Sequence, residues 1–198
     1  MKNFLRHSAI YKLFSSLIGA AKGRAILSRE YIVSDKSNRI LDLCCGTCDI
    51  LPYLEFHEYV GVDISEEYIN YDKQAFARYE NVRFIKEDIN TFLQTNESEF
   101  DIILFIGGMH HINDEQLLGC LQNIRTALSP DGKLVTLDGC YEPGLSPFTR
   151  LLLRNDRGEY VREKDAWVKL FTSVFPDYKY DIRKDLLRIP YNHIIFYK

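Results

Sequence analysis

Five short apolar segments, separated by stretches with helical periodicity, constrain the fold more than any other feature of this sequence. Each has the length of one strand and is apolar enough to be buried on both faces, as strands of parallel sheets are. Such an alternation of strand and helix predicts an α/β fold with a doubly wound parallel sheet. The five segments are residues 39–44, 59–63, 82–86, 100–106 and 133–138.

Helix signals lie between and beyond these segments. A helix should begin after Ser65, because the acids that follow it favour an N-terminal turn, and should extend to about Tyr79. A second helix should begin at Asn113 or Asp114 and end before the turn that contains Pro130. The other predicted elements are helices after the 44–48 loop and over residues 10–21, 25–32 and 164–174, and strands over residues 178–185 and 191–197.

The composition is that of one compact domain and excludes several classes of protein. The 198 residues carry 25 Lys and Arg against 28 Asp and Glu, and a formal charge of −3 provides no general attraction to nucleic acid. The longest apolar run, residues 102–109, is shorter than the roughly 18 residues of a transmembrane helix. The N-terminus does not resemble a signal peptide, and an odd number of cysteines, five, favours a reducing environment. We therefore expect a cytoplasmic protein with no nucleic-acid partner.

Acidic residues mark the carboxyl ends of three of the predicted strands. Asp42 lies in the first strand, Asp63 ends the second, and Asp88 follows the third. Open parallel sheets bind ligands at this edge. If the ligand carries an adenosyl group, Asp63 can accept hydrogen bonds from the ribose hydroxyls and Asp88 from the adenine amine. Ile64 or Ile89 would then pack against the adenine ring.

These motifs resemble those of the class I S-adenosylmethionine (SAM)-dependent methyltransferases, particularly small-molecule enzymes of the ubiquinone and menaquinone C-methyltransferase type. Such enzymes carry acids after their first three strands, a Gly-x-Gly-x-Gly turn after the first, a Phe-Asp strand leading into Leu-His-His, and a Leu-x-Pro-Gly-Gly turn. The resemblance implies a single Rossmann-like domain over residues 1–198, with seven strands of which the last is antiparallel. The matching stretches are residues 40–48, 61–64, 87–89, 100–112 and 128–134.

The resemblance also suggests roles for the two segments that flank the central motifs. Residues 1–35 would form an N-terminal helical lid, and residues 139–175 an insertion on the acceptor side. Residues 1–29 contain six Lys and Arg and no acid, so an alternative for this basic helix is peripheral contact with an anionic membrane surface.

By the same resemblance, the cofactor would be SAM, lying over residues 42–48. Cys44 and Cys48 occupy the two outer glycine positions of the turn, whereas Gly46 keeps the middle position, where a side chain would block the approach of a ligand to the backbone. The segment disfavours NAD, because Asp49 would stand where a pyrophosphate needs positive potential. The residues expected at the cofactor are Asp42, Cys44, Gly46, Asp63, Ile64, Asp88, Ile89 and Ile106.

Methyl transfer from a sulfonium is an in-line displacement, so the main task of the protein is to position the reactants. A base is needed only if the acceptor loses a proton. The loops after the fourth and fifth strands should border the acceptor, which makes His110, His111 and Tyr141 the catalytic candidates, with Asp138 and Tyr160 as further ones. The alternative for the two histidines is a structural role in a turn.

Basic residues also crowd the segment after the fifth strand. Arg150, Arg154, Arg157 and Tyr160 are candidates for binding a small-molecule acceptor that carries a phosphate or carboxylate, because arginine binds both groups through paired hydrogen bonds. The alternative is a solvated helix face, since acids alternate with these arginines. The acceptor expected from the sequence is thus a small molecule, either anionic or lipid-linked.

Three other functions are compatible with parts of the sequence. The Cys45-x-x-Cys48 pair is typical of thiol oxidoreductases. Zinc could be bound by Cys44, Cys45 and Cys48 together with His110 or His111, although structural zinc sites prefer ligands from two separated turns, and we expect no metal. The missing glycines of the first motif would also suit a SAM-binding protein without catalytic activity.

Overall fold

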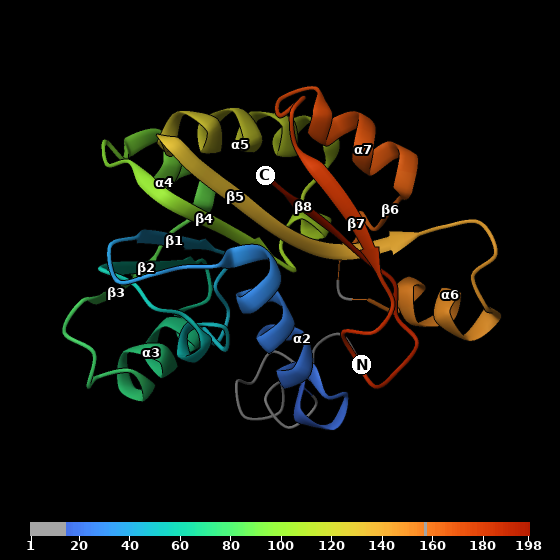
Figure 1. Ribbon diagram of the computed structural model, residues 1–198, viewed down its shortest axis with the longest axis horizontal. Coiled ribbons are helices and arrows are strands. Elements are labelled where there is room, and N and C mark those ends of the chain that lie inside the picture. The colour runs from blue at the N-terminus through green and yellow to red at the C-terminus, as the bar shows by residue number, and fades with distance from the viewer. Residues whose placement is uncertain (1–14, 157) are drawn as a thin grey trace.

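The computed structural model describes residues 15–156 and 158–198. Its centre is an eight-stranded sheet in the order β3-β2-β1-β4-β5-β8-β7, with β6 paired to β5 (Figure 1). β8 runs antiparallel to β5 and β7, and the other pairs are parallel, so the predicted doubly wound sheet with an antiparallel last strand is confirmed. The strands are β1 Arg39–Leu43, β2 Glu58–Asp63, β3 Val82–Lys86, β4 Phe100–Ile106, β5 Leu128–Tyr141, β6 Arg162–Glu163, β7 Lys179–Arg183 and β8 His193–Tyr197.

Helices cover both faces of the sheet, as Figure 1 shows. One face packs against α4, α5 and α7 through side chains such as Phe92, Ile124 and Trp167. The other packs against α2 and α3 through side chains such as Leu27 and Ile69. The α-helices are α2 Ala20–Leu27, α3 Glu66–Ala75, α4 Ile89–Thr95, α5 Asp114–Ala127, α6 Pro147–Arg154 and α7 Lys164–Thr172.

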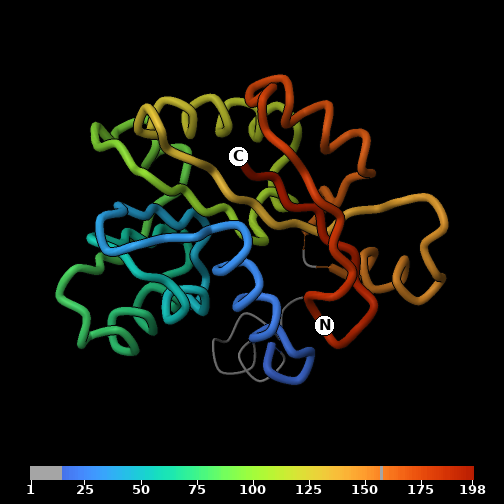
Figure 2. Tube along the Cα trace, in the orientation of Figure 1, coloured from blue at the N-terminus to red at the C-terminus, as the bar shows by residue number. Residues whose placement is uncertain are grey.

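The described part of the N-terminal segment packs against the connection between the last two strands. α2 continues into a wider turn over Ser28–Ile32, so the helix predicted from residue 25 begins earlier, at Ala20. Lys22 donates a hydrogen bond to the carbonyl of Asp185 at 2.9 Å, and Figure 2 shows this helix beside the loop that joins β7 to β8. Residues 10–14 of the first predicted helix lie outside the described residues.

The capping residues act as the sequence predicts. The side chain of Ser65 accepts a hydrogen bond from the amide of Tyr68 at the start of α3, and Asn113 accepts one from Gln116 at the start of α5. α3 ends at Ala75, a few residues before the predicted end. β5 is longer than the segment predicted for it, because residues 129–132 form an irregularity in its pairing with β4 instead of a separate turn.

The helix predicted after the 44–48 loop is absent. A single 3₁₀ turn, Leu51–Tyr53, takes its place, with Pro52 at the start. Residues 44–57 join the parallel neighbours β1 and β2, and the rest of this connection is turns and irregular loop. The prediction was therefore wrong for this element.

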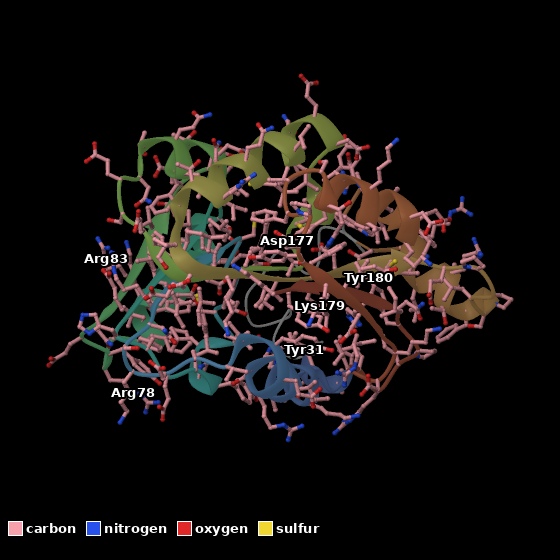
Figure 3. The ribbon with its side chains drawn as sticks, turned by 45° about the horizontal axis from the view of Figure 1, so that its top comes forward. Tyr31, Arg78, Arg83, Asp177, Lys179 and Tyr180 are labelled. Atoms are coloured by element: carbon pink, nitrogen blue, oxygen red, sulfur yellow. The ribbon has the colours of Figure 1, made fainter. Side chains whose placement is uncertain are left out.

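The two edges of the sheet carry polar side chains. Arg83 on β3 pairs with Glu58 of β2 at 2.7 Å, and Figure 3 shows Arg83 and Arg78 projecting outward at that edge. At the opposite edge, Tyr31 donates a hydrogen bond to Asp181 of β7 at 2.8 Å. Among the described residues, we find no helix with the length and apolar character needed to cross a membrane.

Candidate active site

The strand order reverses at β1, and this places three strand ends side by side. β1 lies between β2 and β4, so Leu43 is opposite Val62 on one side and Phe105 on the other. The chain leaves β1 toward β2 and β3 and then returns to β4 on the other side. In doubly wound sheets, this reversal opens a crevice at the carboxyl ends of the strands, where ligands bind.

The loop after β1 has a left-handed backbone at three alternate residues. Its φ angles are 56° at Cys44, 59° at Gly46 and 46° at Cys48. These are the three glycine positions of the Gly-x-Gly-x-Gly turn that this loop resembles. The two cysteines therefore adopt the backbone conformation that glycine adopts most easily. A Cβ added to Gly46 would meet no atom within 4 Å. The loop therefore leaves open space beside Gly46.

Two buried carboxylates lie at the ends of β1 and β2, and one of them holds this loop. Asp63 accepts hydrogen bonds from the amide of Gly46 at 3.0 Å and from that of Ser65 at 2.8 Å, one on each oxygen. Each of these oxygens keeps a second lone pair that can accept from a ligand. Asp42 accepts a hydrogen bond from the hydroxyl of Tyr59. Burial raises the pKa of Asp42 to about 7, even though this hydrogen bond lowers it.

The next strand ends provide apolar and acidic groups at the surface. Ile64 is 70% exposed, which is unusual for a large apolar side chain, and it directly follows Asp63. Asp88 caps α4 by accepting hydrogen bonds from two amides on its Oδ1, which leaves Oδ2 available. Ile89 is buried in the core, whereas Ile106 is half-buried and precedes Gly107, beside which the space is also open. The edge thus fits an adenosyl ligand, with Ile64 and not Ile89 exposed toward solvent.

His110 lies between two carboxylates. Its Nδ1 is 2.5 Å from Asp138 Oδ1, and its Nε2 is 3.1 Å from Asp156 Oδ1. Tyr191 donates a hydrogen bond to the other oxygen of Asp156 at 2.5 Å. Burial alone would lower the pKa of His110, but the hydrogen bonds to Asp138 and Asp156 raise it to about 10. His110 is therefore an imidazolium at neutral pH, with both ring nitrogens engaged, and it fastens the segment after α6 to the ends of β4 and β5.

The other catalytic candidates lie near this cluster. The exposed ring of His111 is 4.4 Å from that of His110, centroid to centroid. Tyr141 ends β5 and is half-buried. Burial raises the pKa of Tyr141, the charges of Arg150 and Arg154 lower it, and those of Glu163 and Asp156 raise it, so both cations and anions act on this hydroxyl.

The remaining substrate candidates are placed differently. Tyr160 is 39% exposed, and its amide donates a hydrogen bond to the carbonyl of His110 at 2.9 Å. Arg157 lies outside the described residues.

Arg162 is a structural residue that the sequence did not reveal. It is 8% exposed, donates hydrogen bonds to Asp114 and to the carbonyls of Ile112 and Tyr160, and lies 4.5 Å from the centre of the Trp167 ring. In the sequence it is one member of a run of alternating charges. Such a run does not indicate which of its charged residues becomes buried, because the tertiary packing determines this.

The cysteines of the loop do not have the environment of a redox pair. The hydrogen bond with Cys48 lowers the pKa of Cys45, but burial and the charge of Asp42 raise it to about 11. Burial also raises the pKa of Cys48. Reactive thiols need a lowered pKa, and the helix that could lower it is replaced by a 3₁₀ turn. His110, which the sequence offered as a zinc ligand, is engaged with Asp138 and Asp156 instead.

Comparison with known proteins relates the chain to methyltransferases. A family model described as a methyltransferase domain matches residues 40–132. A demethylmenaquinone methyltransferase from Staphylococcus epidermidis is 25% identical over 167 residues, which cover 75% of this chain and 68% of that protein. A protein of the same name from Staphylococcus aureus is 29% identical over 121 residues, covering 59% of this chain and 48% of the relative.

Solved structures share the fold at lower sequence identity. The N-methyltransferase NodS from Bradyrhizobium japonicum, in complex with S-adenosyl-L-homocysteine, has a TM-score of 0.67 and 15% identity, covering 90% of this chain and 86% of that one. Human N-acetylserotonin methyltransferase, in complex with SAM, has a TM-score of 0.68 and 18% identity, covering 96% and 54%.

Proposed function

We propose that the chain is a class I SAM-dependent methyltransferase that transfers a methyl group from SAM to a small-molecule acceptor with an anionic group. The observation that carries the proposal is the pair of exposed arginines on α6, Arg150 and Arg154, in the segment that follows β5. Arginine recognises carboxylates and phosphates through paired hydrogen bonds.

The cofactor side of the proposal assigns one task to each strand end. Asp63 would bind the ribose hydroxyls, Asp88 would accept from the adenine amine through its available oxygen, and Ile64 would pack on the ring. Gly46 would allow the methionine portion to approach the backbone, with Asp42 behind the loop. When bound, SAM supplies a methyl group already activated by its positive sulfur, so these residues need only hold it in place.

Cys44 and Ile106, both half-buried at this edge, would complete the floor of the cofactor pocket. Ile89 belongs to the hydrophobic core beside Phe92, so its contribution would be indirect, through the position of α4.

The charge run after β5 supports an anion site because two of its arginines are not used in ion pairs with the described acids around them. Asp156 pairs with His110, Arg162 with Asp114, and Asp165 with Lys164. Among the described residues, Arg150 and Arg154 form no ion pair. Both are exposed, so their charges are available to an acceptor.

The same helix offers an apolar surface, which suits a second class of acceptor. Phe148 is 54% exposed and Leu151 is 53% exposed, next to the two arginines. The curated relatives are named for demethylmenaquinone. A lipid-linked acceptor with an acidic head would use both kinds of side chain on α6.

For the reaction itself, we propose positioning by His110 and Tyr141 and proton acceptance by His111. His110 has both nitrogens committed to carboxylates, so it would order the acceptor loop and would not act as the base. The raised pKa of Tyr141 keeps its hydroxyl protonated, so it would orient the acceptor by a hydrogen bond. An acceptor that loses no proton would not need His111 as a base.

The Arg150→Ala/Arg154→Ala double variant tests the acceptor site. Methyl transfer from SAM should be measured on pairs of small aromatic acids and their methyl esters, and on a quinol with and without a prenyl tail. With an acidic acceptor, we expect the variant to raise KM by at least tenfold, about 1.4 kcal/mol, with little change in kcat.

Arg78→Ala is the matched control, because Arg78 is an exposed arginine at the opposite edge of the sheet (Figure 3). It should leave KM unchanged. An equal KM for acids and esters, or a double variant that behaves like Arg78→Ala, would contradict the anionic acceptor while leaving methyl transfer intact.

A further inference from the structure

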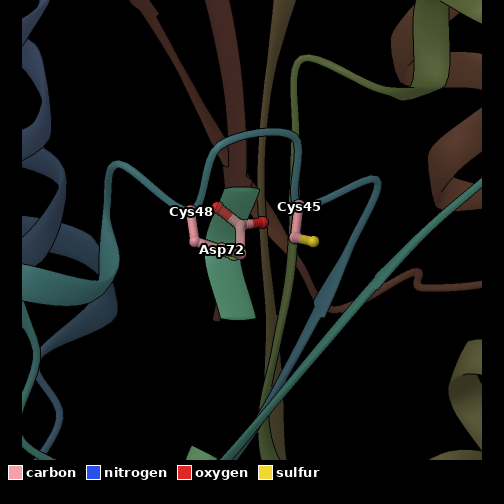
Figure 4. A group of neighbouring side chains, drawn as sticks. All are labelled: Cys45, Cys48 and Asp72. Carbon is pink, nitrogen blue, oxygen red and sulfur yellow. The ribbon is translucent and has the colours of Figure 1, made fainter. Parts of the chain in front are cut away.

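Two cysteines and an aspartate converge beneath the loop that follows β1. Cys45 and Cys48 belong to that loop, and Asp72 projects toward them from α3 (Figure 4). One ligand atom of each, the two Sγ atoms and a carboxylate oxygen, lie within 4.8 Å of one another. Cys48 and Asp72 are fully buried, and Cys45 is half-buried. No other group of this kind occurs within residues 15–156 and 158–198.

The local backbone turns both sulfurs to the same side. The amide of Cys48 donates a hydrogen bond to the carbonyl of Cys45 at 2.9 Å, which closes a tight turn. The left-handed backbone at Cys48, with φ of 46°, completes that turn. A pair of cysteines separated by two residues in a tight turn is the arrangement with which proteins commonly hold a metal.

Gly61 of β2 makes room for the two sulfurs. A Cβ at this position would lie 3.1 Å from Cys45 Sγ and 3.3 Å from Cys48 Sγ, closer than ordinary contact allows. The two sulfurs therefore occupy the space that a side chain at position 61 of β2 would fill. This places them on the inner side of the loop, toward the sheet, whereas the space beside Gly46 is open.

We propose that Cys45, Cys48 and Asp72 form a zinc-binding site that fastens the loop after β1 to α3. Two thiolates and one carboxylate are ordinary ligands of Zn²⁺, with bonds of about 2.3 Å to sulfur and 2.0–2.2 Å to oxygen. At these bond lengths, tetrahedral ligand atoms lie roughly 3.3–3.8 Å apart, so atoms that now lie within 4.8 Å of one another have to move together by at most about 1.5 Å. A water molecule completes the coordination.

The charges around the sulfurs favour a cation. The carboxylate of Asp42 acts electrostatically on both thiols, as does that of Asp72. A divalent ion would interact favourably with these carboxylates and would lower the pKa of the thiols that it binds. The site does not depend on the identity of the methyl acceptor.

Metal binding by the full-length protein tests this site. The reduced protein, stripped of metal, is titrated with Co²⁺, followed by displacement with Zn²⁺ in competition with a chromogenic chelator. We expect about one equivalent of metal per chain, with the intense visible bands of tetrahedral cobalt and a thiolate-to-cobalt charge-transfer band. Saturating Zn²⁺, at 100 times Kd, should raise Tm by roughly 5–10 °C.

Two variants remove one ligand each with little disturbance of the fold. Cys48→Gly replaces the thiol with the residue best suited to a φ of 46°, and Asp72→Asn keeps the shape of the side chain while removing its charge. Both should weaken Zn²⁺ binding by at least tenfold. Cys140→Ala, at a buried cysteine of β5 outside the cluster, is the control and should bind Zn²⁺ as the wild type does.

Three results would overturn the proposal. One is a wild-type protein that binds no more Co²⁺ or Zn²⁺ than Cys48→Gly. Another is a cobalt spectrum without thiolate bands. The third is a Cys45–Cys48 disulfide, detected by mass in the protein as purified, that forms in place of metal uptake. Because none of these readouts measures methyl transfer, each leaves the proposed function untouched.

Discussion

At the scale of single residues, the loop after β1 shows how far a motif tolerates substitution. Cys44 and Cys48 adopt the left-handed backbone that glycine would adopt at these positions, at a cost of about 1–2 kcal/mol for each. Gly46, the middle position, is the one whose missing Cβ faces open space. The middle position of the motif, beside which the space is open, is therefore glycine, whereas the two outer positions are cysteine.

This strain can be measured by comparing two variants that both lack the thiol. Cys44→Gly should be more stable than Cys44→Ala by about 1 kcal/mol, because alanine must adopt a φ of 56° that glycine adopts freely. Urea unfolding measures the difference. The same pair at Cys120, inside α5, is the control, and there alanine should be the more stable by about 1 kcal/mol. Equal stability of the two Cys44 variants would show that the backbone at this position is not strained.

At the scale of elements, His110 and its two carboxylates join segments that are distant in the sequence. Asp138 comes from β5 and Asp156 from the residues after α6, and His110 lies in the short turn Met109–His111 after β4. The imidazolium stabilises the fold as long as it stays protonated. Its pKa of about 10 in the folded protein is well above the ordinary value of 6.5.

The sign of the pH dependence follows from this upward shift. The contribution of His110 should be complete below about pH 6.5 and should be lost as the pH rises toward 10. We expect His110→Gln to destabilise the protein by about 3 kcal/mol at pH 6 and by much less at pH 9.5. Urea unfolding at several pH values measures this, with the exposed His57→Gln as a control that changes little. A penalty that stays constant between pH 6 and pH 9.5 would contradict the ionic role of His110.

The accuracy of the sequence-based predictions also differs between elements, for physical reasons. The five inner strands were predictable because burial on both faces requires continuous apolar runs, and α3 and α5 because Ser65 and Asn113 are N-caps. The absence of an α-helix after residue 48 was not predictable, because no residue pattern in this segment distinguishes a 3₁₀ turn from a short α-helix. Asp88 was predicted to contact the ligand. In the structure, the same side chain also caps α4.

At the scale of the whole molecule, topology gathers the site from residues that are far apart in sequence. The order β3-β2-β1-β4-β5 places Asp63, the 44–48 loop and the end of β4 around one reversal of the sheet. The acids at the strand ends could be identified from sequence because parallel strands end at one edge. The partners of His110 and the burial of Arg162 could not, because they depend on how the segment after β5 folds back onto the sheet.

The central claim is that this edge binds the adenosyl group of SAM through Asp63, and calorimetric titration of SAM into the wild type and Asp63→Ala tests it most directly. Asp131→Ala, at an exposed acid of β5, is the matched control, and thermal melts establish that all three proteins are folded. We predict that the control keeps the affinity of the wild type and that Asp63→Ala loses detectable binding. An Asp63→Ala affinity within tenfold of the wild type, or about 1.4 kcal/mol, would contradict the account.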